Sequence, residues 1–167
     1  VKVAIEENEL FKDYDYPLSV EIKINDRKEE IDFLMRLGNI VIVGESKSVV
    51  VTDSSISHHR TKEILQHASE QAKRKSIFAN ENIDKVFEKC KWNLEKEVEY
   101  KFIPLVIISN KINSGFKFND VFVSDEVLLE RYFSGNEVPL ISSLQGDNIA
   151  WVELYKTEKE AIENFSI

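Results

Sequence analysis

The chain of 167 residues is long enough for one domain with its own core, and 43% of its residues are hydrophobic, as in globular proteins. Its formal net charge of −8 argues against a protein that coats nucleic acid by bulk electrostatic attraction. A single cysteine, Cys90, excludes an internal disulfide and a cysteine-based zinc cluster. The apolar runs are far shorter than the ~20 residues that cross a bilayer. No secretory signal is visible, so we expect a cytoplasmic protein without a membrane partner.

The first third of the chain predicts a short helix and then three antiparallel strands. Residues 3–14 have weak helical periodicity, and residues 18–25 alternate apolar and polar side chains, as a strand with one exposed face does. The next predicted strand, residues 30–37, ends at Gly38 and Asn39, which tolerate the positive φ of a tight hairpin. Residues 40–51 predict a third strand, whose apolar first half indicates a central place in the sheet.

The remainder predicts a helical crossover and further strands. Residues 58–97 are helix-prone with an apolar stripe, and residues 79–82 predict a bend or break into two helices. A buried strand at 100–109 follows, and a helix between two strands is the crossover that a parallel neighbour requires. A strand at 120–125, a helix at 126–133, an alternating segment at 148–156 and a capping-box spacing at Thr157 and Glu160 complete the pattern. The sequence therefore predicts one α/β domain over residues 1–167, with a mixed sheet flanked by helices.

Charged residues follow directly on the most apolar strand. Side chains alternate along a strand, so Glu45 and Lys47 share a face. Pairing through the 38–39 turn sets Asp32 roughly opposite Glu45. Two close carboxylates repel, and one takes up a proton unless a cation lies between them. Because Mg²⁺ prefers oxygen ligands, the pattern predicts a Mg²⁺ site, with Mn²⁺ as a substitute, formed by Asp32, Glu45 and a backbone carbonyl near Ser46.

A metal at this position lowers the pKa of bound water and acts as a Lewis acid toward a phosphodiester. Lys47 then positions or deprotonates the attacking water, or stabilises the charge that develops on the phosphorus. Asp32, Glu45 and Lys47 are therefore the candidate catalytic residues.

Asp32, the twelve residues after it and the triplet Glu45-Ser46-Lys47 resemble the motif of the PD-(D/E)XK nuclease superfamily, which has the restriction-endonuclease-like fold. The order of hairpin, motif strand, helix and strand is similar to the family core over residues 18–109. The resemblance implies a Mg²⁺-dependent endonuclease that cleaves DNA, or less often RNA. It also implies a homodimer or one domain of a longer chain, and the missing initial methionine suits a piece of a longer protein. The residue before Asp32 is Ile31, where the fullest family pattern has proline.

Two further family positions have candidates in this chain. Many members carry an acid on the first helix, and three glutamates are candidates for it: Glu6, Glu7 and Glu9. Some members also have a catalytic glutamine on the helix after the motif, for which we take Gln71, with Gln66 as the other candidate. The Q-x-x-x-Y form is absent, because Lys75 stands where the tyrosine would be.

Structural roles compete with these functional ones. Glu45 and Lys47 also suit an ion pair at a strand end, and Asp32 suits a solvated carboxylate on an edge strand. Residues 60–75 carry five basic against two acidic side chains, an excess of +3, which fits a weak nucleic-acid surface or a solvated helix face. The histidine pair at 58–59 fits a helix surface or a phosphate contact. The tryptophans at 92 and 151 are expected in the core rather than stacked on bases.

The sequence thus supports two functions on one fold. The first is metal-dependent cleavage of DNA. The second is an inactive nuclease-fold domain that binds nucleic acid or a partner protein, since a fold does not determine a function. An unrelated α/β hydrolase is disfavoured, because the chain has no G-x-S-x-G motif and its five glycines supply no phosphate-binding loop.

Overall fold

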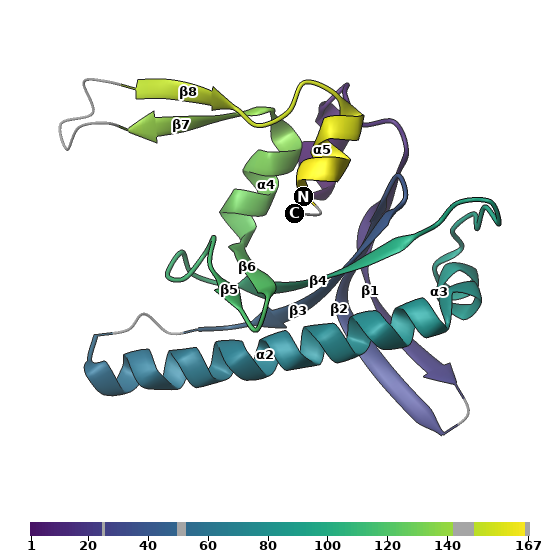
Figure 1. Cartoon of the computed structure of the whole chain (residues 1–167), viewed down its shortest axis with the longest axis horizontal. Coiled ribbons are helices and arrows are strands. Elements are labelled where there is room, and N and C mark those ends of the chain that lie inside the picture. The colour runs from purple at the N-terminus through teal and green to yellow at the C-terminus, as the bar shows by residue number, and fades with distance from the viewer. Residues whose placement is uncertain (25, 50–52, 142–148, 166–167) are drawn as a thin grey trace.

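The computed structural model describes residues 1–24, 26–49, 53–141 and 149–165, and helices cover both faces of a mixed sheet (Figure 1). The described strands form a six-stranded sheet in the order β1-β2-β3-β4-β6-β5 and a separate two-stranded sheet, β7-β8. The strands are β1 (Tyr14–Ile24), β2 (Arg27–Leu37), β3 (Ile40–Lys47), β4 (Lys101–Ile108), β5 (Lys117–Phe118), β6 (Val121–Asp125), β7 (Glu137–Ile141) and β8 (Ile149–Glu153). The helices are α1 (Lys2–Glu7), α2 (Ser55–Glu81), α3 (Ile83–Cys90), α4 (Glu126–Ser134) and α5 (Glu158–Phe165).

The predicted antiparallel meander is confirmed. β2 pairs with both β1 and β3, and the β2–β3 ladder closes at Leu37↔Ile40 across a two-residue turn. Gly38 adopts a φ of +54° in this turn, a conformation that glycine reaches without steric cost. β1 begins four residues earlier than the predicted strand, because the alternating segment continues back through Tyr14.

The predicted crossover is also confirmed. β3 and β4 run parallel from Ile40↔Lys101 to Lys47↔Ile108, and α2 and α3 connect them. The helical stretch breaks at Asn82, inside the predicted segment, so that α2 has 27 residues and α3 has eight. β6 adds to β4 as a further parallel strand.

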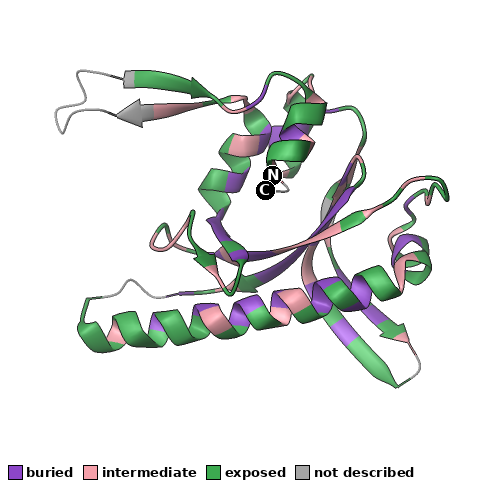
Figure 2. Ribbon diagram, in the orientation of Figure 1, coloured by how far each residue is buried: buried purple, intermediate pink, exposed green. Residues whose placement is uncertain are grey.

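α2 lies across one face of the sheet, and α1, α4 and α5 pack on the other (Figure 1). The middle of α2 packs on β4 and β6 through Leu65, Ala68 and Ala72, and its C-terminal end packs on β1–β3 through Phe78 and Ala79. Figure 2 shows buried positions recurring along α2, between exposed ones. Successive residues of β3 pack alternately on the two faces of the sheet. The residue after Gly44, which is Glu45, therefore points toward α2.

The C-terminal segment differs from the sequence prediction. The alternating segment at 148–156 contributes β8, which pairs with β7 outside the main sheet. The expected core position of Trp151 is therefore wrong: the residue is 61% exposed on this two-stranded ribbon. Trp92 is buried against Phe87, as expected. Within the described ranges, no helix is both long and apolar enough to span a bilayer.

Candidate active site

The pairing of β2 with β1 is irregular next to the candidate site. Between the pairs Leu18↔Leu34 and Val20↔Ile31, β1 advances two residues while β2 advances three. β2 therefore holds one extra residue at 32–33, which is the arrangement of a β-bulge. A bulge bends its strand and redirects the side chain beside it, and here that side chain is the carboxylate of Asp32.

β2 and β3 separate beyond this bulge. Their ladder ends at Phe33↔Gly44, and the next contact is made by a side chain, because Asp32 Oδ2 accepts a hydrogen bond from the backbone N–H of Ser46 at 2.9 Å. The structure thereby brings the Asp32 carboxylate to the β3 residue that follows Glu45. Asp32 is partly exposed, whereas Glu45 is only 3% exposed.

Gly44 allows the close approach of β2 at this point. A Cβ added to Gly44 would lie 2.8 Å from Phe33 Cβ and 3.1 Å from Ile107 Cδ1, closer than side chains normally pack. A glycine directly before Glu45 therefore lets the strands carrying the two carboxylates remain adjacent.

Glu45 is held by two lysines from different elements. Lys47, two residues along β3, donates from Nζ to Glu45 Oε1 at 2.6 Å. Lys75 of α2 donates from Nζ to Glu45 Oε2. Burial raises the pKa of Glu45, but the hydrogen bonds and charges of Lys47 and Lys75 outweigh this effect and hold the pKa below its ordinary value. Glu45 is therefore ionised at neutral pH.

The two lysines change the charge balance that the sequence predicted. Asp32 and Glu45 carry two negative charges, and Lys47 and Lys75 carry two positive charges, so these four side chains sum to zero. Repulsion between the carboxylates therefore does not by itself demand a divalent cation. The oxygen donors remain suited to one, but a metal at Glu45 would compete with ammonium groups already present.

Lys75 is the site residue that sequence reasoning missed. The side of α2 that faces the sheet repeats at spacings of three and four residues through Leu65, Ala68, Ala72 and Ala79. Lys75 occupies the next position of this stripe after Ala72. A lysine inside an otherwise apolar stripe indicates a buried acidic partner, because an unpaired buried ammonium is costly.

Gln71, the predicted catalytic glutamine, lies one turn before Lys75 on α2. Its Oε1 is buried and accepts no hydrogen bond from any described residue. Gln66 instead contributes only its backbone carbonyl, which accepts from Asn119 Nδ2 at 3.4 Å. Gln71 is therefore the better placed of the two candidate glutamines.

The three N-terminal glutamates are exposed and lie outside the cleft beside Asp32. The Tyr16 hydroxyl donates to Glu6, which with Tyr14 and burial raises the pKa of Tyr16. The described structure thus gives no support to Glu6, Glu7 or Glu9 as site acids.

An open cleft of about 570 Å³ adjoins Asp32, Ser46 and Lys47. Its walls also include Ser109 after β4 and Glu126 at the start of α4. We call this the β3 cleft. Lys47 lines the cleft and its side chain is 29% exposed, whereas Glu45 is not among the lining residues.

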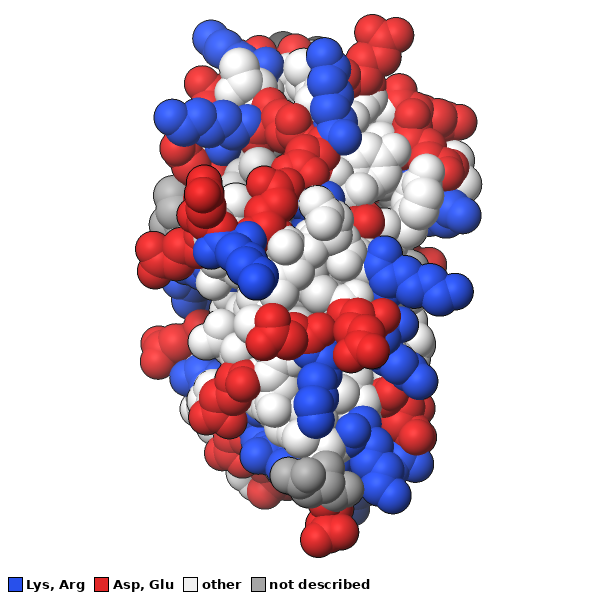
Figure 3. Space-filling view, turned by 90° about the vertical axis from the view of Figure 1, so that its right-hand side faces the viewer, with Lys and Arg blue, Asp and Glu red and all other residues white. Residues whose placement is uncertain are grey.

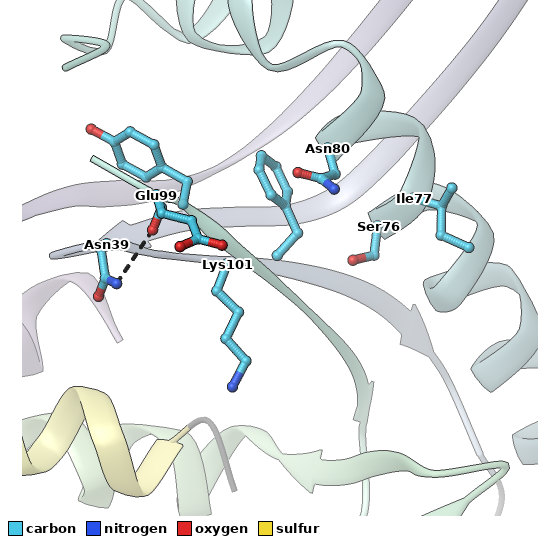
Figure 4. Close-up of a pocket in the computed structure, with 8 residues that line it drawn as sticks. Asn39, Ser76, Ile77, Asn80, Glu99 and Lys101 are labelled. Carbon is cyan, nitrogen blue, oxygen red and sulfur yellow. Dashed lines mark hydrogen bonds between the residues drawn. The ribbon is translucent and has the colours of Figure 1, made fainter. Parts of the chain in front are cut away.

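A second pocket, of about 560 Å³, lies at the opposite end of β3 and β4 (Figure 4). Asn39 and Lys101, at the beginnings of these strands, line it together with Ser76 and Asn80 of α2. Asn39 Nδ2 donates to the backbone carbonyl of Glu99 at 3.4 Å. This pocket is separated from Lys47 by the length of β3 and holds none of the predicted site residues.

The basic segment at 60–75 is not a free positive surface. Three of its five cations pair with carboxylates elsewhere: Lys73 with Asp120 at 3.9 Å, Arg74 with Glu29 at 3.1 Å, and Lys75 with Glu45. The histidine pair at 58–59 is exposed at the start of α2. Figure 3 shows another face of the molecule, on which acidic and basic side chains are interspersed. The predicted excess of +3 is thus largely neutralised.

Comparisons with protein-family models, with curated proteins and with solved structures find no match for the chain.

Proposed function

We propose that the chain is a divalent-metal-dependent nuclease that hydrolyses phosphodiester bonds of DNA. The observation that carries the proposal is the placement of Asp32 at the Ser46 amide, next to the Glu45–Lys47 pair and beside an open cleft. The meander followed by a crossover helix and a parallel strand is further support, because it is the order that the resemblance to PD-(D/E)XK nucleases implies. We include in the proposal that the sheet is restriction-endonuclease-like and that the nuclease acts as a homodimer or as part of a longer chain.

The donor atoms fit Mg²⁺ by type. Asp32 and Glu45 offer carboxylate oxygens and Ser46 offers a backbone carbonyl, and Mg²⁺ is commonly bound by one or two carboxylates together with waters and substrate phosphate. When bound, such an ion supplies a water of lowered pKa and polarises the phosphodiester. Mn²⁺ is a substitute with the same preference for oxygen.

The chain's own residues have distinct tasks in this proposal. Asp32 is oriented by the Ser46 N–H, which leaves Oδ1 available to a ligand from the cleft. Lys47 can donate to a phosphate oxygen or hold the attacking water, because its side chain is partly exposed beside the cleft while Nζ is bonded to Glu45. Glu45 anchors that ammonium from behind.

Plasmid cleavage tests the proposal. Supercoiled DNA is incubated with Mg²⁺ or Mn²⁺ and with wild type, Asp32→Ala, Lys47→Ala or the control Lys62→Ala, which changes an exposed lysine of α2. We expect wild type and the control to nick equally and the two site variants to lose about 100-fold or more, as removal of a catalytic group typically does. Equal nicking by all four proteins would assign the activity to a contaminant.

The charge balance favours a second candidate, a nuclease-fold domain that does not cut and binds nucleic acid or a partner protein. Both oxygens of Glu45 are bonded to ammonium groups, and the charges of Asp32, Glu45, Lys47 and Lys75 sum to zero without a metal. Calorimetry with Mn²⁺ separates the candidates. No saturable site up to millimolar Mn²⁺, together with a DNA mobility shift that does not depend on metal, would support the binding domain.

A further inference from the structure

The pair between Glu45 and Lys75 is buried on both sides. The side chain of Lys75 is 9% exposed and that of Glu45 is 4% exposed, and the pair lies between the two apolar contacts that α2 makes with the sheet. Removing one partner of a buried ion pair leaves an uncompensated charge, which is strongly destabilising. Lys75 therefore cannot release Glu45 unless another acceptor receives its ammonium group.

A divalent cation at Glu45 would require this release. The carboxylate has two oxygens, and Lys47 and Lys75 each occupy one of them. An ammonium group and a metal ion repel each other at one carboxylate. Lys47 belongs to the same strand as Glu45 and reaches the cleft, whereas Lys75 approaches Glu45 from α2. Displacement of Lys75 would therefore open Glu45 from the side of α2.

Gln71 supplies the acceptor that a displaced Lys75 needs. Residues four apart on a helix lie on the same side, with Cβ atoms about 6 Å apart. The Oε1 of Gln71 is buried and has no hydrogen-bond partner among the described residues, an uncommon and costly state for a buried amide oxygen. It can therefore gain a hydrogen bond when Lys75 turns toward it.

We propose that Lys75 is a positioning residue that competes with a divalent cation for Glu45 and moves to Gln71 when the cation binds. This inference rests on the proposed function, since it concerns the same metal site. It assigns opposite effects to two neighbours on one helix: Lys75 weakens metal binding, and Gln71 strengthens it.

Calorimetric titration with Mn²⁺ alone tests the inference on wild type, Lys75→Met, Gln71→Leu and the control Lys62→Met. Coupling between two linked binding events commonly amounts to about 5–150-fold. We expect Lys75→Met to bind Mn²⁺ about 10-fold more tightly than wild type and Gln71→Leu to bind about 5-fold more weakly, with Lys62→Met unchanged. Gln71→Glu, which offers a stronger acceptor to Lys75, is expected to bind more tightly than wild type. Circular dichroism confirms that each variant is folded.

The outcomes separate this inference from the proposed function. Unchanged or weaker Mn²⁺ binding by folded Lys75→Met would overturn the competition, while a wild-type site and plasmid cleavage would leave the nuclease proposal standing. If wild type binds no Mn²⁺ and Lys75→Met acquires a saturable site, the competition is supported and the metal-dependent nuclease is not. If no variant binds Mn²⁺, both are overturned. Should Lys75→Met fail to fold, Gln71→Leu and Gln71→Glu decide: equal affinities in these two variants would refute the inference.

Discussion

Gly44→Ala probes the close approach of β2 and β3 at the candidate site. The added methyl group would lie 2.8 Å from Phe33 Cβ, an atom attached to the β2 backbone that no rotamer change can move away. It would also lie 3.1 Å from Ile107 Cδ1 on β4, so the methyl group is confined from both neighbouring strands. Relief of this overlap requires β2 and β3 to move apart next to the Asp32 bulge.

The expected loss of stability follows from two opposing effects. Overpacking a core costs ~1–3 kcal/mol, and replacing glycine by alanine returns ~0.4–1 kcal/mol by restricting the unfolded chain. The net destabilisation is about 1–2 kcal/mol. A chain of 167 residues has an unfolding entropy of roughly 0.35 kcal/mol per kelvin, so the melting temperature should fall by roughly 3–6 °C.

Scanning calorimetry measures this shift, with Gly135→Ala as the matched control. Gly135 has extended backbone and no atom within 4 Å of an added Cβ, so its substitution should leave the melting temperature unchanged or raise it slightly. If Gly44→Ala were as stable as wild type, or if both variants lost the same amount, contact with Phe33 would not be the reason for glycine at this position. On the proposed function, Mn²⁺ affinity should also fall in Gly44→Ala and stay unchanged in Gly135→Ala, since the movement shifts the strand that carries Asp32 away from the strand that carries Glu45.

Three further predictions concern single side chains. The pKa of Glu45 is lower in the folded protein than its ordinary value of 4.5, so its contribution to stability is present above that pH and is lost as the pH falls through the folded-state pKa. Urea unfolding between pH 7 and pH 3 should therefore show a steeper loss of stability for wild type than for Glu45→Gln. Parallel curves for the two proteins would contradict this. Burial raises the pKa of the Cys90 thiol to about 11, so little of it is thiolate, the reactive form, at pH 8. At that pH the thiol should react with a disulfide reagent about 100-fold more slowly in folded than in urea-unfolded protein. Equal rates in the two states would show that the thiol is not buried. The Tyr155 hydroxyl donates to the carbonyls of Tyr132 and Gly135, the latter at 3.0 Å. Tyr155→Phe should therefore lower the free energy of unfolding in urea by about 1–2 kcal/mol. An unchanged free energy of unfolding would show that water replaces the bond.

The main sheet could be predicted because its signals are local. The alternation in β1, the apolar run in β3 and the positive φ required at Gly38 each depend on residues a few positions apart. The break of the long helix at Asn82 was visible for the same reason. By contrast, β7 contains Pro139, and its pairing with β8 is a contact outside the main sheet that no local pattern indicates.

In the candidate site, too, local features could be predicted and features that depend on tertiary packing could not. Counting residues back from a two-residue turn predicted that Asp32 faces Glu45, whereas the ladder ends at Phe33↔Gly44 and Asp32 accepts from the Ser46 N–H. The bulge at 32–33 was not predictable in this way, because it reflects a mismatch of register with β1 rather than with β3. The contact of Lys75 with Glu45 depends on how α2 is rotated over the sheet, which tertiary packing determines.

The two carboxylates of the site therefore differ in a way that the motif alone does not distinguish. Asp32 is accessible from the β3 cleft and has an oxygen available, whereas both oxygens of buried Glu45 are occupied by lysines. On the proposed function, a cation in the cleft would meet Asp32 first and would bind Glu45 only if an ammonium group moved. On the proposed function, metal-dependent cleavage therefore requires that Lys75 can leave Glu45 as well as that the motif residues are present. In that proposal, Gln71 lowers the free energy of the movement, because its buried Oε1 has no hydrogen-bond partner among the described residues and lies on the same side of the helix.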